Sequence, residues 1–467
     1  MKESSIVRNI SYSFFANLLY LVVSAVMVII VPKLISLNDY GMWQLFLFYF
    51  SYLGFLHLGW EDGIYLRYAG NELEELPGKR LSGQFYAIIF LQLVLATIVS
   101  GIGKLFIQDY QKLNVLLCAV WMAPLVNFNN LCNFILQITD RIREYAKLIA
   151  LERLMLLIGV LLFITVLGRK HFLDMYIAQV GAIVVTAIAG SWFCRKIFFF
   201  PPDPLKQILQ EAKKNIVVGS KLMTANIANM LIIGIVRYGI SWGWNVTTFG
   251  KVSLTLGISN FLMVFINSVS VVFFPIVKRM DQARRESVYM AIRNALTFIL
   301  FGGLLFYYPI RSILAWWLPK YANSLVYMSI LFPVCVFESK MGLLINTYLK
   351  SMRQEALMLK INTVSVMVSA IVTWFTVVVF HNLDIAIFSV VFLYAFRCLL
   401  AEFWIGKLLH LQLYRKMAVD CGMCAIFILS GWCFDNLFCM GVYGAFFILY
   451  AGLHYKELKT VVREVRE

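Results

Sequence analysis

The stretch "LNDYGMWQLFLFYFSYLGFLHLGWEDGIYLRYAG", residues 37–70, decides the fold class. From Gly41 to His57 its residues are almost wholly apolar, and Glu61, Asp62 and Arg67 then follow within a few positions. A helix needs about 20 apolar residues to cross the hydrocarbon core of a bilayer. The stretch therefore predicts a membrane span that ends close to three charged side chains.

Composition extends this prediction to the whole chain. Of its 467 residues, 61% are hydrophobic and 14% are charged, and the mean hydropathy is +0.79. Soluble domains are about half apolar and about a quarter charged. Apolar segments recur up to the C-terminus, which excludes a signal peptide followed by a soluble domain, and the first segment lacks a small-residue cleavage site. We therefore predict an all-α polytopic membrane protein whose first apolar segment is a retained span.

Fourteen segments are long and apolar enough to be read as membrane spans. They are Ile10–Val31, Gly41–Leu58, Phe85–Leu105, Val115–Ile138, Leu148–Leu167, Phe172–Phe193, Ile216–Trp242, Val252–Ile276, Ile292–Ile310, Leu325–Leu349, Ile361–Phe380, Ile385–Leu408, Met417–Phe434 and Leu437–Leu453. The last two are short, and only Asp435 and Asn436 separate them. No loop on the outer side is long enough to hold a catalytic or receptor domain.

The distribution of Lys and Arg orients the chain. With the N-terminus in the cytoplasm, the cytoplasmic segments and the span ends next to them carry 28 Lys and Arg, and the outer side carries 7. Such an excess marks the cytoplasmic side, so both termini are predicted to be cytoplasmic in a multi-pass protein of the bacterial cytoplasmic (inner) membrane. The net charge of +16 is then mostly a surface that faces anionic lipid headgroups, and it requires no nucleic-acid partner.

A basic linker divides the chain. In the longest cytoplasmic connection, Pro201, Pro202 and Pro204 break any helix, and "PLKQILQEAKKN" then predicts a short amphipathic helix on the membrane surface. The predicted organisation is an N-terminal six-helix lobe (1–194), the linker with its amphipathic helix (195–215), a C-terminal six-helix lobe (216–410), and two additional helices with a cytoplasmic tail (411–467).

The two halves share a short repeat. Ala16-Asn17 precedes Tyr40-Gly41 by 24 residues, and Ala225-Asn226 precedes Phe249-Gly250 by the same distance. Each copy starts at the first span of its half, and six spans separate the copies, so the halves have parallel topology. Parallel repeats predict two lobes around a central cavity, an arrangement that suits alternating access.

The stretch at residues 37–70 resembles the second-span signature of polysaccharide and O-antigen flippases. These belong to the multidrug/oligosaccharidyl-lipid/polysaccharide exporter (MOP) superfamily. The residues that match the signature are Tyr40, Gly41, Leu58, Gly59, Arg67 and Tyr68. The resemblance covers residues 5 to 410.

The second half resembles the seventh span of the same family. In "NMLIIGIVRYGISWGWNVTTFG", Arg237 matches the arginine of an Asp-Arg pair that precedes a loop ending in an aromatic residue and glycine. Val236 stands where the acid is common. Any role of that acid is therefore absent here or is met by another residue.

The resemblance implies a transporter, not an enzyme. It would flip an undecaprenyl-diphosphate-linked oligosaccharide across the membrane for the assembly of capsule, O-antigen or exopolysaccharide. Its partners would be the lipid-linked glycan, membrane lipids, and the polysaccharide polymerase and glycosyltransferases of the same pathway. No cofactor is expected, and coupling to a proton or sodium gradient stays open.

Ionisable and polar groups at membrane depth usually face a cavity or a partner. The predicted cationic substrate-binding residues are Arg237, Lys221, Lys340, Arg397 and Arg67. The predicted polar lining is Asn17, Asn226, Asn127, Asn130, Asn133, Asn260 and Asn267. The predicted ion-coupling residues are Glu338, Asp62 and Glu61, the last two near a cytoplasmic mouth that Arg67 rims.

Each of these assignments has a structural alternative. The deep charges can pair between helices, for example Glu338 with Arg397, and asparagines can hold helices together. Arg67 can be an interfacial anchor, and Arg153 can reach the cytoplasmic surface along its aliphatic stem. The motif Cys421-x-x-Cys424 lacks further ligands at metal-binding spacing, so no metal site is predicted.

Two other functions remain as rivals. A multidrug or organic-cation antiporter of the same superfamily would need acids in its cavity, whereas the deep groups here are four cations (Lys221, Arg237, Lys340 and Arg397) and one acid, Glu338. A membrane polysaccharide polymerase or ligase would need catalytic groups in a sizeable outer loop. The five His are scattered, and no pair of carboxylates or nucleophile with a base is evident.

Overall fold

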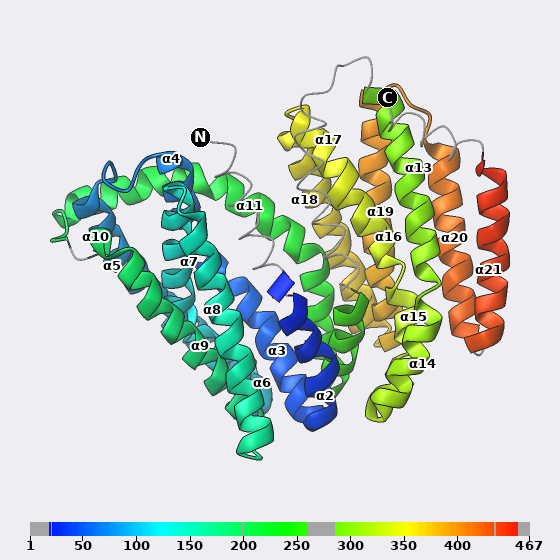
Figure 1. The fold of residues 1–467 in the computed structure, drawn as a ribbon, viewed down its shortest axis with the longest axis horizontal. Helices are drawn as coiled ribbons and strands as arrows, with labels where there is room; N and C mark the ends of the chain where they lie inside the picture. The colour runs from blue at the N-terminus through cyan, green and yellow to red at the C-terminus, as the bar shows by residue number, and fades with distance from the viewer. Residues whose placement is uncertain (1–17, 20, 199, 260–284, 434–435, 456–467) are drawn as a thin grey trace. The chain divides into compact units, whose positions relative to one another are not determined.

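The computed structural model describes residues 18–19, 21–198, 200–259, 285–433 and 436–455, and this part of the chain is helical without strands (Figure 1). Ten of its helices are long and apolar enough to cross a membrane, and two shorter apolar helices accompany them. The predicted all-α polytopic class is confirmed. Much of the predicted spans at 10–31 and 252–276 lies outside the described residues.

The helices divide into two compact units. The first comprises residues 1–227 and 246–250, and the second comprises residues 228–245 and 251–467. The segment 411–467, predicted to follow the two lobes, belongs to the second unit.

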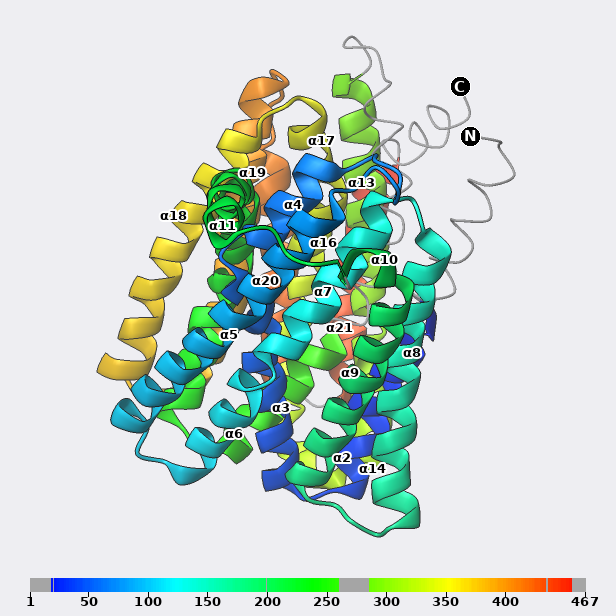
Figure 2. The ribbon, with the colours of Figure 1, turned by 90° about the vertical axis from the view of Figure 1, so that its left-hand side faces the viewer.

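Nine α-helices whose full bounds lie within the described residues precede the long helix α11 in the first unit. They are α2 (Val31–Leu34), α3 (Leu37–Leu53), α4 (Trp60–Tyr68), α5 (Gly78–Phe106), α6 (Tyr110–Val120), α7 (Ala123–Ile138), α8 (Ile142–Leu161), α9 (Phe172–Phe193) and α10 (Arg195–Phe198). Three short π- or 3₁₀-helical segments interrupt them, at Val26–Ile30, Gly54–His57 and Leu162–Val166. Helices α8 and α9 lie side by side along their length (Figures 1 and 2).

Local signals set several of these boundaries. Ser36 caps α3 by accepting a hydrogen bond from the backbone N–H of Asp39 (3.0 Å), and Asp109 caps α6 through the N–H groups of Gln111 and Lys112. The helical conformation is interrupted between α3 and α4, because Leu58 and Gly59 have left-handed φ angles of 54° and 81°. The predicted second span therefore ends at Leu58, as expected, and α4 begins in a new direction with Trp60.

Helix α11 runs without interruption from Leu205 to Gly243, 39 residues (Figure 1). The residues predicted to form a short amphipathic helix are the first part of this longer helix, because no proline lies between Leu205 and Gly243. A helix of this length extends about 58 Å, and the hydrocarbon core is about 30 Å thick. Residues 205–215 are thus the part of α11 that lies outside the predicted span.

The second unit contains the end of α11 and a further set of helices. They are α13 (Arg285–Leu304), α14 (Tyr307–Trp317), α15 (Tyr327–Leu331), α16 (Val334–Ser339), α17 (Asn346–Ser351), α18 (Glu355–Thr373), α19 (Leu383–Leu408), α20 (Tyr414–Cys433) and α21 (Asn436–Leu453). Short segments at Pro319–Ser324, Lys340–Ile345 and Trp374–Val379 are 3₁₀- or π-helical. Helix α19 packs on α16 and α18, and α20 packs on α21.

Candidate functional site

A partly open cavity of about 380 Å³, with both polar and apolar walls, lies in the first unit. Helices α7 and α8 contribute its polar side chains, which are Asn129, Asn130, Asn133, Glu152 and Arg153. The remaining walls are apolar, with Phe50 of α3 and Ile183 of α9 among them. Two of the predicted lining residues, Asn130 and Asn133, are thus brought to one cavity.

The asparagines of α7 have different roles. The side-chain amide of Asn127 donates to the carbonyls of Leu53 (3.1 Å) and Ala123 (3.0 Å), so this predicted lining residue holds α7 against the end of α3. Asn129 donates to the carbonyl of Ile183 (3.1 Å). Among the described residues, the side-chain oxygens of Asn129 and Asn133 are buried and accept no hydrogen bond. These two oxygens are available to a ligand that donates hydrogen bonds.

Three lining residues were missed by the sequence reasoning. Asn129 lies next to the predicted stripe, and Glu152 and Arg153 lie in the first half of α8. Arg153 was expected to be able to reach the membrane surface, but the structure places it at the cavity. The signal that could have found them is the adjacent opposite charges "ER" inside a predicted span.

Two acids at the start of α4 are buried. Glu61 has 0% exposure, and neither of its carboxylate oxygens has a hydrogen-bond partner among the described residues. Asp62 lies 3.7 Å from Nε2 of His57, whose Nδ1 accepts from the N–H of Gly59 (2.9 Å). The two acids were predicted near an open mouth, and the structure instead encloses them within the first unit.

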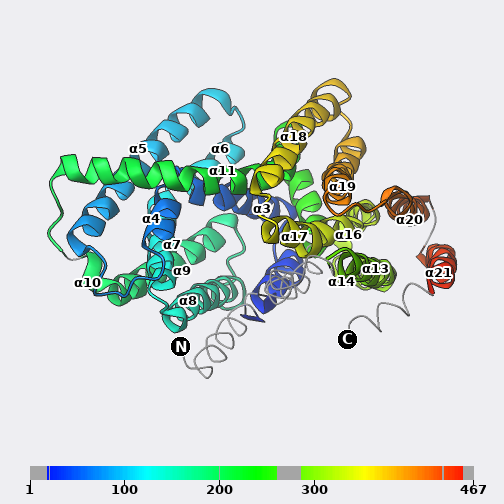
Figure 3. The same cartoon turned by 90° about the horizontal axis from the view of Figure 1, so that it is seen from above.

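Close backbone crossings hold α4 against α11 (Figure 3). A Cβ atom on Gly59 would lie 2.6 Å from the backbone nitrogen of Ser220. A Cβ on Gly63 would overlap the backbone of Asn215, and one on Gly219 would overlap the backbone of Gly59. Glycine at these positions is what permits the approach.

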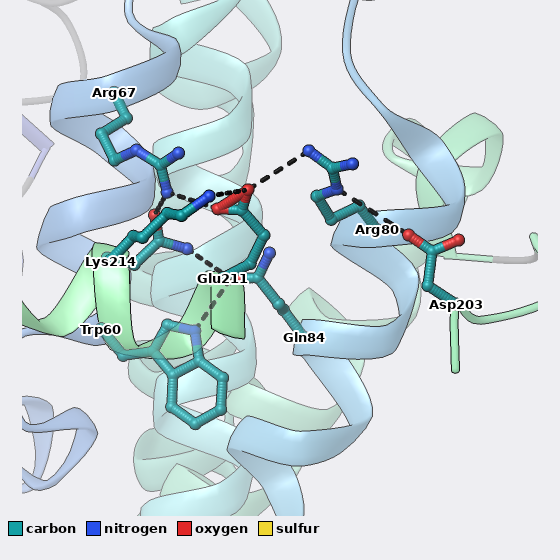
Figure 4. Close-up of polar contacts among 8 residues, drawn as sticks. Trp60, Arg67, Arg80, Gln84, Asp203, Glu211 and Lys214 are labelled. Carbon is teal, nitrogen blue, oxygen red and sulfur yellow. Dashed lines mark hydrogen bonds and ion pairs between the residues drawn. The ribbon is translucent and has the colours of Figure 1, made fainter. Parts of the chain in front are cut away.

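Arg67 belongs to a cluster of charges at the start of α11 (Figure 4). Its Nη1 donates to Oε2 of Glu211 at 2.8 Å and also to the side chain of Asn215. Arg80 of α5 and Lys214 approach Oε1 of the same carboxylate, at 3.2 and 3.5 Å. Arg80 also lies 3.8 Å from Asp203. We call Arg67, Arg80 and Lys214 with Glu211 and Asp203 the α11 charge cluster.

Gln84 and Asn215 are fully buried next to this cluster, and Asn215 accepts a hydrogen bond from Arg67. The indole of Trp60 donates to Oε1 of Gln84 at 2.9 Å, and Asn215 donates to the same oxygen. The hydrogen bond from Arg67 and the surrounding cations hold the pKa of Glu211 below its ordinary value. Glu211 is therefore an ionised acceptor at neutral pH.

Arg237 lies in the second unit, on the last third of α11. It is half-buried, and its Nη2 donates to Oγ of Ser253 at 3.2 Å. Val236 is fully buried, so the position of the missing acid faces the protein interior. Lys221 and Asn226, on the part of α11 in the first unit, are exposed.

Two predicted cationic residues have partners within the second unit. Nη1 of Arg397 lies 3.3 Å from Oε2 of Glu338, and its Nε donates to the amide oxygen of Asn362 at 3.1 Å. The interhelical pairing alternative is therefore the arrangement observed for Glu338 and Arg397.

Lys340 lies in a sealed group of four charges. Its Nζ is 2.8 Å from Glu402 and 2.6 Å from Asp420, and Arg293 contacts the same two carboxylates at 3.0 and 2.5 Å. All four side chains are at most 2% exposed. We call these residues the buried tetrad. Its charges compensate one another, so Lys340 is already paired in this structure.

Three predicted lining residues, Asn17, Asn260 and Asn267, are not among those that the structure describes. Within the described part, all nine cysteines are free, including Cys421 and Cys424, and no group of three or more His, Cys, Asp and Glu side chains is placed to hold a metal ion.

Comparison with known proteins identifies the fold. No family model and no curated protein matches the chain. The structure resembles that of lipid II flippase MurJ in an inward closed conformation, with a TM-score of 0.64 and 12% identity over 97% of this chain and 99% of that one. It also resembles an inward-facing multidrug-resistance MATE transporter of the MOP superfamily (TM-score 0.58, 12% identity, 86% and 99% covered). The likeness to a further MATE transporter, in complex with MaD3S, has a TM-score of 0.51 and 14% identity, and it covers 88% of this chain and 94% of that one. The fold is that of MOP-superfamily transporters, as the sequence resemblance predicted.

Proposed function

We propose that this protein flips an undecaprenyl-diphosphate-linked oligosaccharide across the bacterial cytoplasmic membrane by alternating access, for the assembly of a surface polysaccharide. One observation carries the choice within the superfamily. The likeness to the lipid II flippase leaves 3% of this chain unmatched, or about 14 residues, fewer than α20 or α21 contains. The likeness to the MATE transporters leaves more than a tenth unmatched.

The chemistry of such a substrate fits the polar groups in the first unit. A glycan offers hydroxyl donors, and the orphaned amide oxygens of Asn129 and Asn133 accept hydrogen bonds. A diphosphate requires cations, and guanidinium groups bind phosphates through paired hydrogen bonds. Arg237, Lys221 and Arg67 are the cations we assign to the substrate, because Lys221 and Arg67 are exposed and Arg237 is half-buried, whereas Lys340 and Arg397 are buried.

We assign Glu61 and Asp62 to ion coupling. A carboxyl group buried without a partner is costly when ionised and gains or loses a proton with its surroundings. Glu61 has this environment, and Asp62 with His57 supplies two further titratable groups beside it. Glu338 has a guanidinium partner instead.

A multidrug or organic-cation antiporter is the second candidate. The likeness to MATE transporters and the presence of Glu152 in the cavity of the first unit favour it. The two functions differ in cargo, because the antiporter would export ethidium and would not move a lipid-linked glycan.

Reconstitution into proteoliposomes tests the proposal. The vesicles would contain lipid-linked oligosaccharide extracted from a flippase-deficient strain, and a membrane-impermeant glycosidase would report the glycan that appears outside. We expect the purified protein to increase the accessible fraction and to leave ethidium transport unchanged. Ethidium export without glycan flipping would establish the antiporter instead.

A further inference from the structure

The α11 charge cluster differs from the other large charge group in this protein. The buried tetrad contains two cations and two carboxylates and is at most 2% exposed. The α11 charge cluster contains three cations and two carboxylates, so one positive charge is in excess. Its cations are accessible, with 27% of the Arg67 side chain, 42% of Arg80 and 64% of Lys214 exposed. The excess positive charge and the exposure together make the cations accessible to an anionic ligand.

The cations are also incompletely used. Among the described contacts, Arg67 reaches both Glu211 and Asn215 through Nη1 alone. Arg80 and Lys214 both contact Oε1 of the same carboxylate, Arg80 from the side opposite Arg67 and Lys214 from the same side as Arg67 (Figure 4). One carboxylate of charge −1 thus occupies a position where three cations meet. A dianion there would compensate more of the charge and would offer more acceptor oxygens.

The surface of α11 next to the cluster suits a lipid. Ile208, Glu211, Ala212 and Asn215 form the buried face of residues 205–215. On the other faces, Leu205 and Leu209 are 68% and 56% exposed, and Lys206 and Lys213 are exposed beside them. Exposed leucines one turn apart with flanking lysines are typical of a helix at the membrane interface. An anionic headgroup at the cluster would therefore place its hydrocarbon chain beside apolar side chains.

We propose that the α11 charge cluster is a docking site for the diphosphate of the lipid-linked substrate, in which the diphosphate displaces Glu211 from Arg67, Arg80 and Lys214. The site rests on the proposed function, because that function supplies a diphosphate at the cytoplasmic leaflet. It adds a site of first contact built from α4, α5 and α11, separate from Arg237. Glu211 keeps the three cations together until the substrate arrives.

This arrangement predicts opposite effects for removing the cations and removing the acid. Arg80→Gln and Arg67→Gln each delete a hydrogen bond between charged groups and should weaken diphosphate binding about tenfold or more. Glu211→Gln keeps the shape of the side chain but removes the competing charge, and it should tighten binding. If the cluster only held α11 in place, Glu211→Gln would leave binding unchanged or weaken it.

The experiment measures binding of the full-length protein to phosphatidylcholine nanodiscs that contain undecaprenyl diphosphate, by native mass spectrometry. Parallel nanodiscs contain phosphatidylglycerol in its place, and inorganic pyrophosphate serves as a soluble competitor. Lys196→Gln is the matched control, because it removes an exposed cation that pairs with Glu74 outside the cluster. Thermal unfolding of each variant shows that the protein remains folded.

The expected result is preferential binding of undecaprenyl diphosphate, weakened by the two arginine variants, strengthened by Glu211→Gln, reduced by pyrophosphate and unaffected by Lys196→Gln. Equal binding of phosphatidylglycerol would overturn the assignment, since the cluster would then be a general anionic-lipid contact. Wild-type binding that survives Arg67→Gln and Arg80→Gln would overturn this site and leave the proposed function standing. No binding by the wild type would count against the proposed function itself.

Discussion

The cations assigned to the predicted spans differ in what surrounds them. Lys340 and Arg397 are buried and each contacts a carboxylate, whereas Arg237 is half-buried and its Nη2 donates to the hydroxyl of Ser253. A buried cation with a carboxylate partner stabilises the fold or costs little, and removing one partner is costly. Arg237 is thus the position where substrate chemistry and fold stability are most easily separated.

Arg237→Ala should abolish complementation of a flippase-deficient strain while membrane abundance stays close to that of the wild type. Arg237→Lys should restore part of the activity, because an ammonium group lacks the planar paired donors of a guanidinium. Surface glycan and protein abundance, both measured by immunoblot, check this. Ser253→Ala is the matched control for the internal hydrogen bond, and a loss of function equal to that of Arg237→Ala would assign Arg237 a structural role.

The pair of Glu338 and Arg397 gives a prediction of the opposite kind. Arg397→Gln removes the cation beside the partly buried Glu338 carboxylate, and Glu338→Gln leaves the buried guanidinium with its contact to Asn362. Each single variant should lower the thermal stability of the purified protein, and the double variant should be more stable than the sum of the two losses predicts. Strict additivity would show that the 3.3 Å contact contributes nothing.

At the residue scale, the sequence could identify which spans contain charge but not every partner. The pairing of Glu338 with Arg397 was one of two interpretations that the sequence left open. The partners of Lys340 are Glu402 and Asp420, which lie 62 and 80 positions further along the chain. No local pattern brings such distant residues together, because helix packing decides it.

At the scale of elements, the glycines that join α4 to α11 were visible only in part. Gly59 belongs to the family signature in the second span, and the structure gives it a left-handed φ of 81° at the break before α4. Gly219 carried no signal in the sequence, since glycine is common in membrane helices. Its role follows from a backbone that approaches too closely for a Cβ atom. The continuity of α11 was likewise missed, because a change in amphipathicity at Asn215 does not require a break in the helix.

Gly219→Ala should separate α4 from α11 and lower both stability and transport. The added Cβ would overlap the backbone of Gly59 and lie 3.0 Å from the carbonyl carbon of Asp62, and backbone cannot move aside as a flexible side chain can. Fluorescence-detected size-exclusion chromatography after heating measures the loss. Gly181→Ala on α9 is the control, because nothing lies within 4 Å of the added atom there. A normal Gly219→Ala protein would mean that the crossing is not tight in solution.

At the scale of the molecule, the two copies of the sequence repeat contact each other through their glycines. Gly41 and Gly250, the glycines of its two copies, meet within the first unit, where a Cβ on Gly250 would lie 2.6 Å from Cα of Gly41. The all-α polytopic fold class could be predicted from composition and hydropathy, and the superfamily fold from the resemblance of residues 37–70 and of the stretch around Arg237 to the flippase family. The sequence could not predict that α20 belongs to the second unit. This helix lies outside the repeat, and its contact with the rest of the unit includes the ion pairs of Asp420 in the buried tetrad.

The tetrad makes α20 a required part of the second unit, although it was predicted to follow the two lobes. Asp420 is the only tetrad member that α20 contributes, and it contacts both Arg293 and Lys340. Asp420→Ala would leave two cations facing Glu402 alone in a site that is at most 2% exposed. Breaking one partner of a buried ion pair costs about 3–5 kcal/mol, so the variant should be recovered in low yield and unfold at lower temperature.

A compensating change distinguishes charge balance from simple loss of packing. Lys340→Met in the Asp420→Ala background restores one cation and one carboxylate, Arg293 with Glu402, at 3.0 Å. Because a neutral group of well-packed side chains often equals or exceeds a buried ion pair in stability, the double variant should regain most of the lost thermal stability. Glu355→Ala, which removes an exposed carboxylate at the start of α18, should behave as the wild type. If the double variant is no more stable than Asp420→Ala, charge compensation does not hold α20 in place, and its attachment depends on apolar contacts such as those of Phe427 with Tyr307 and Tyr443.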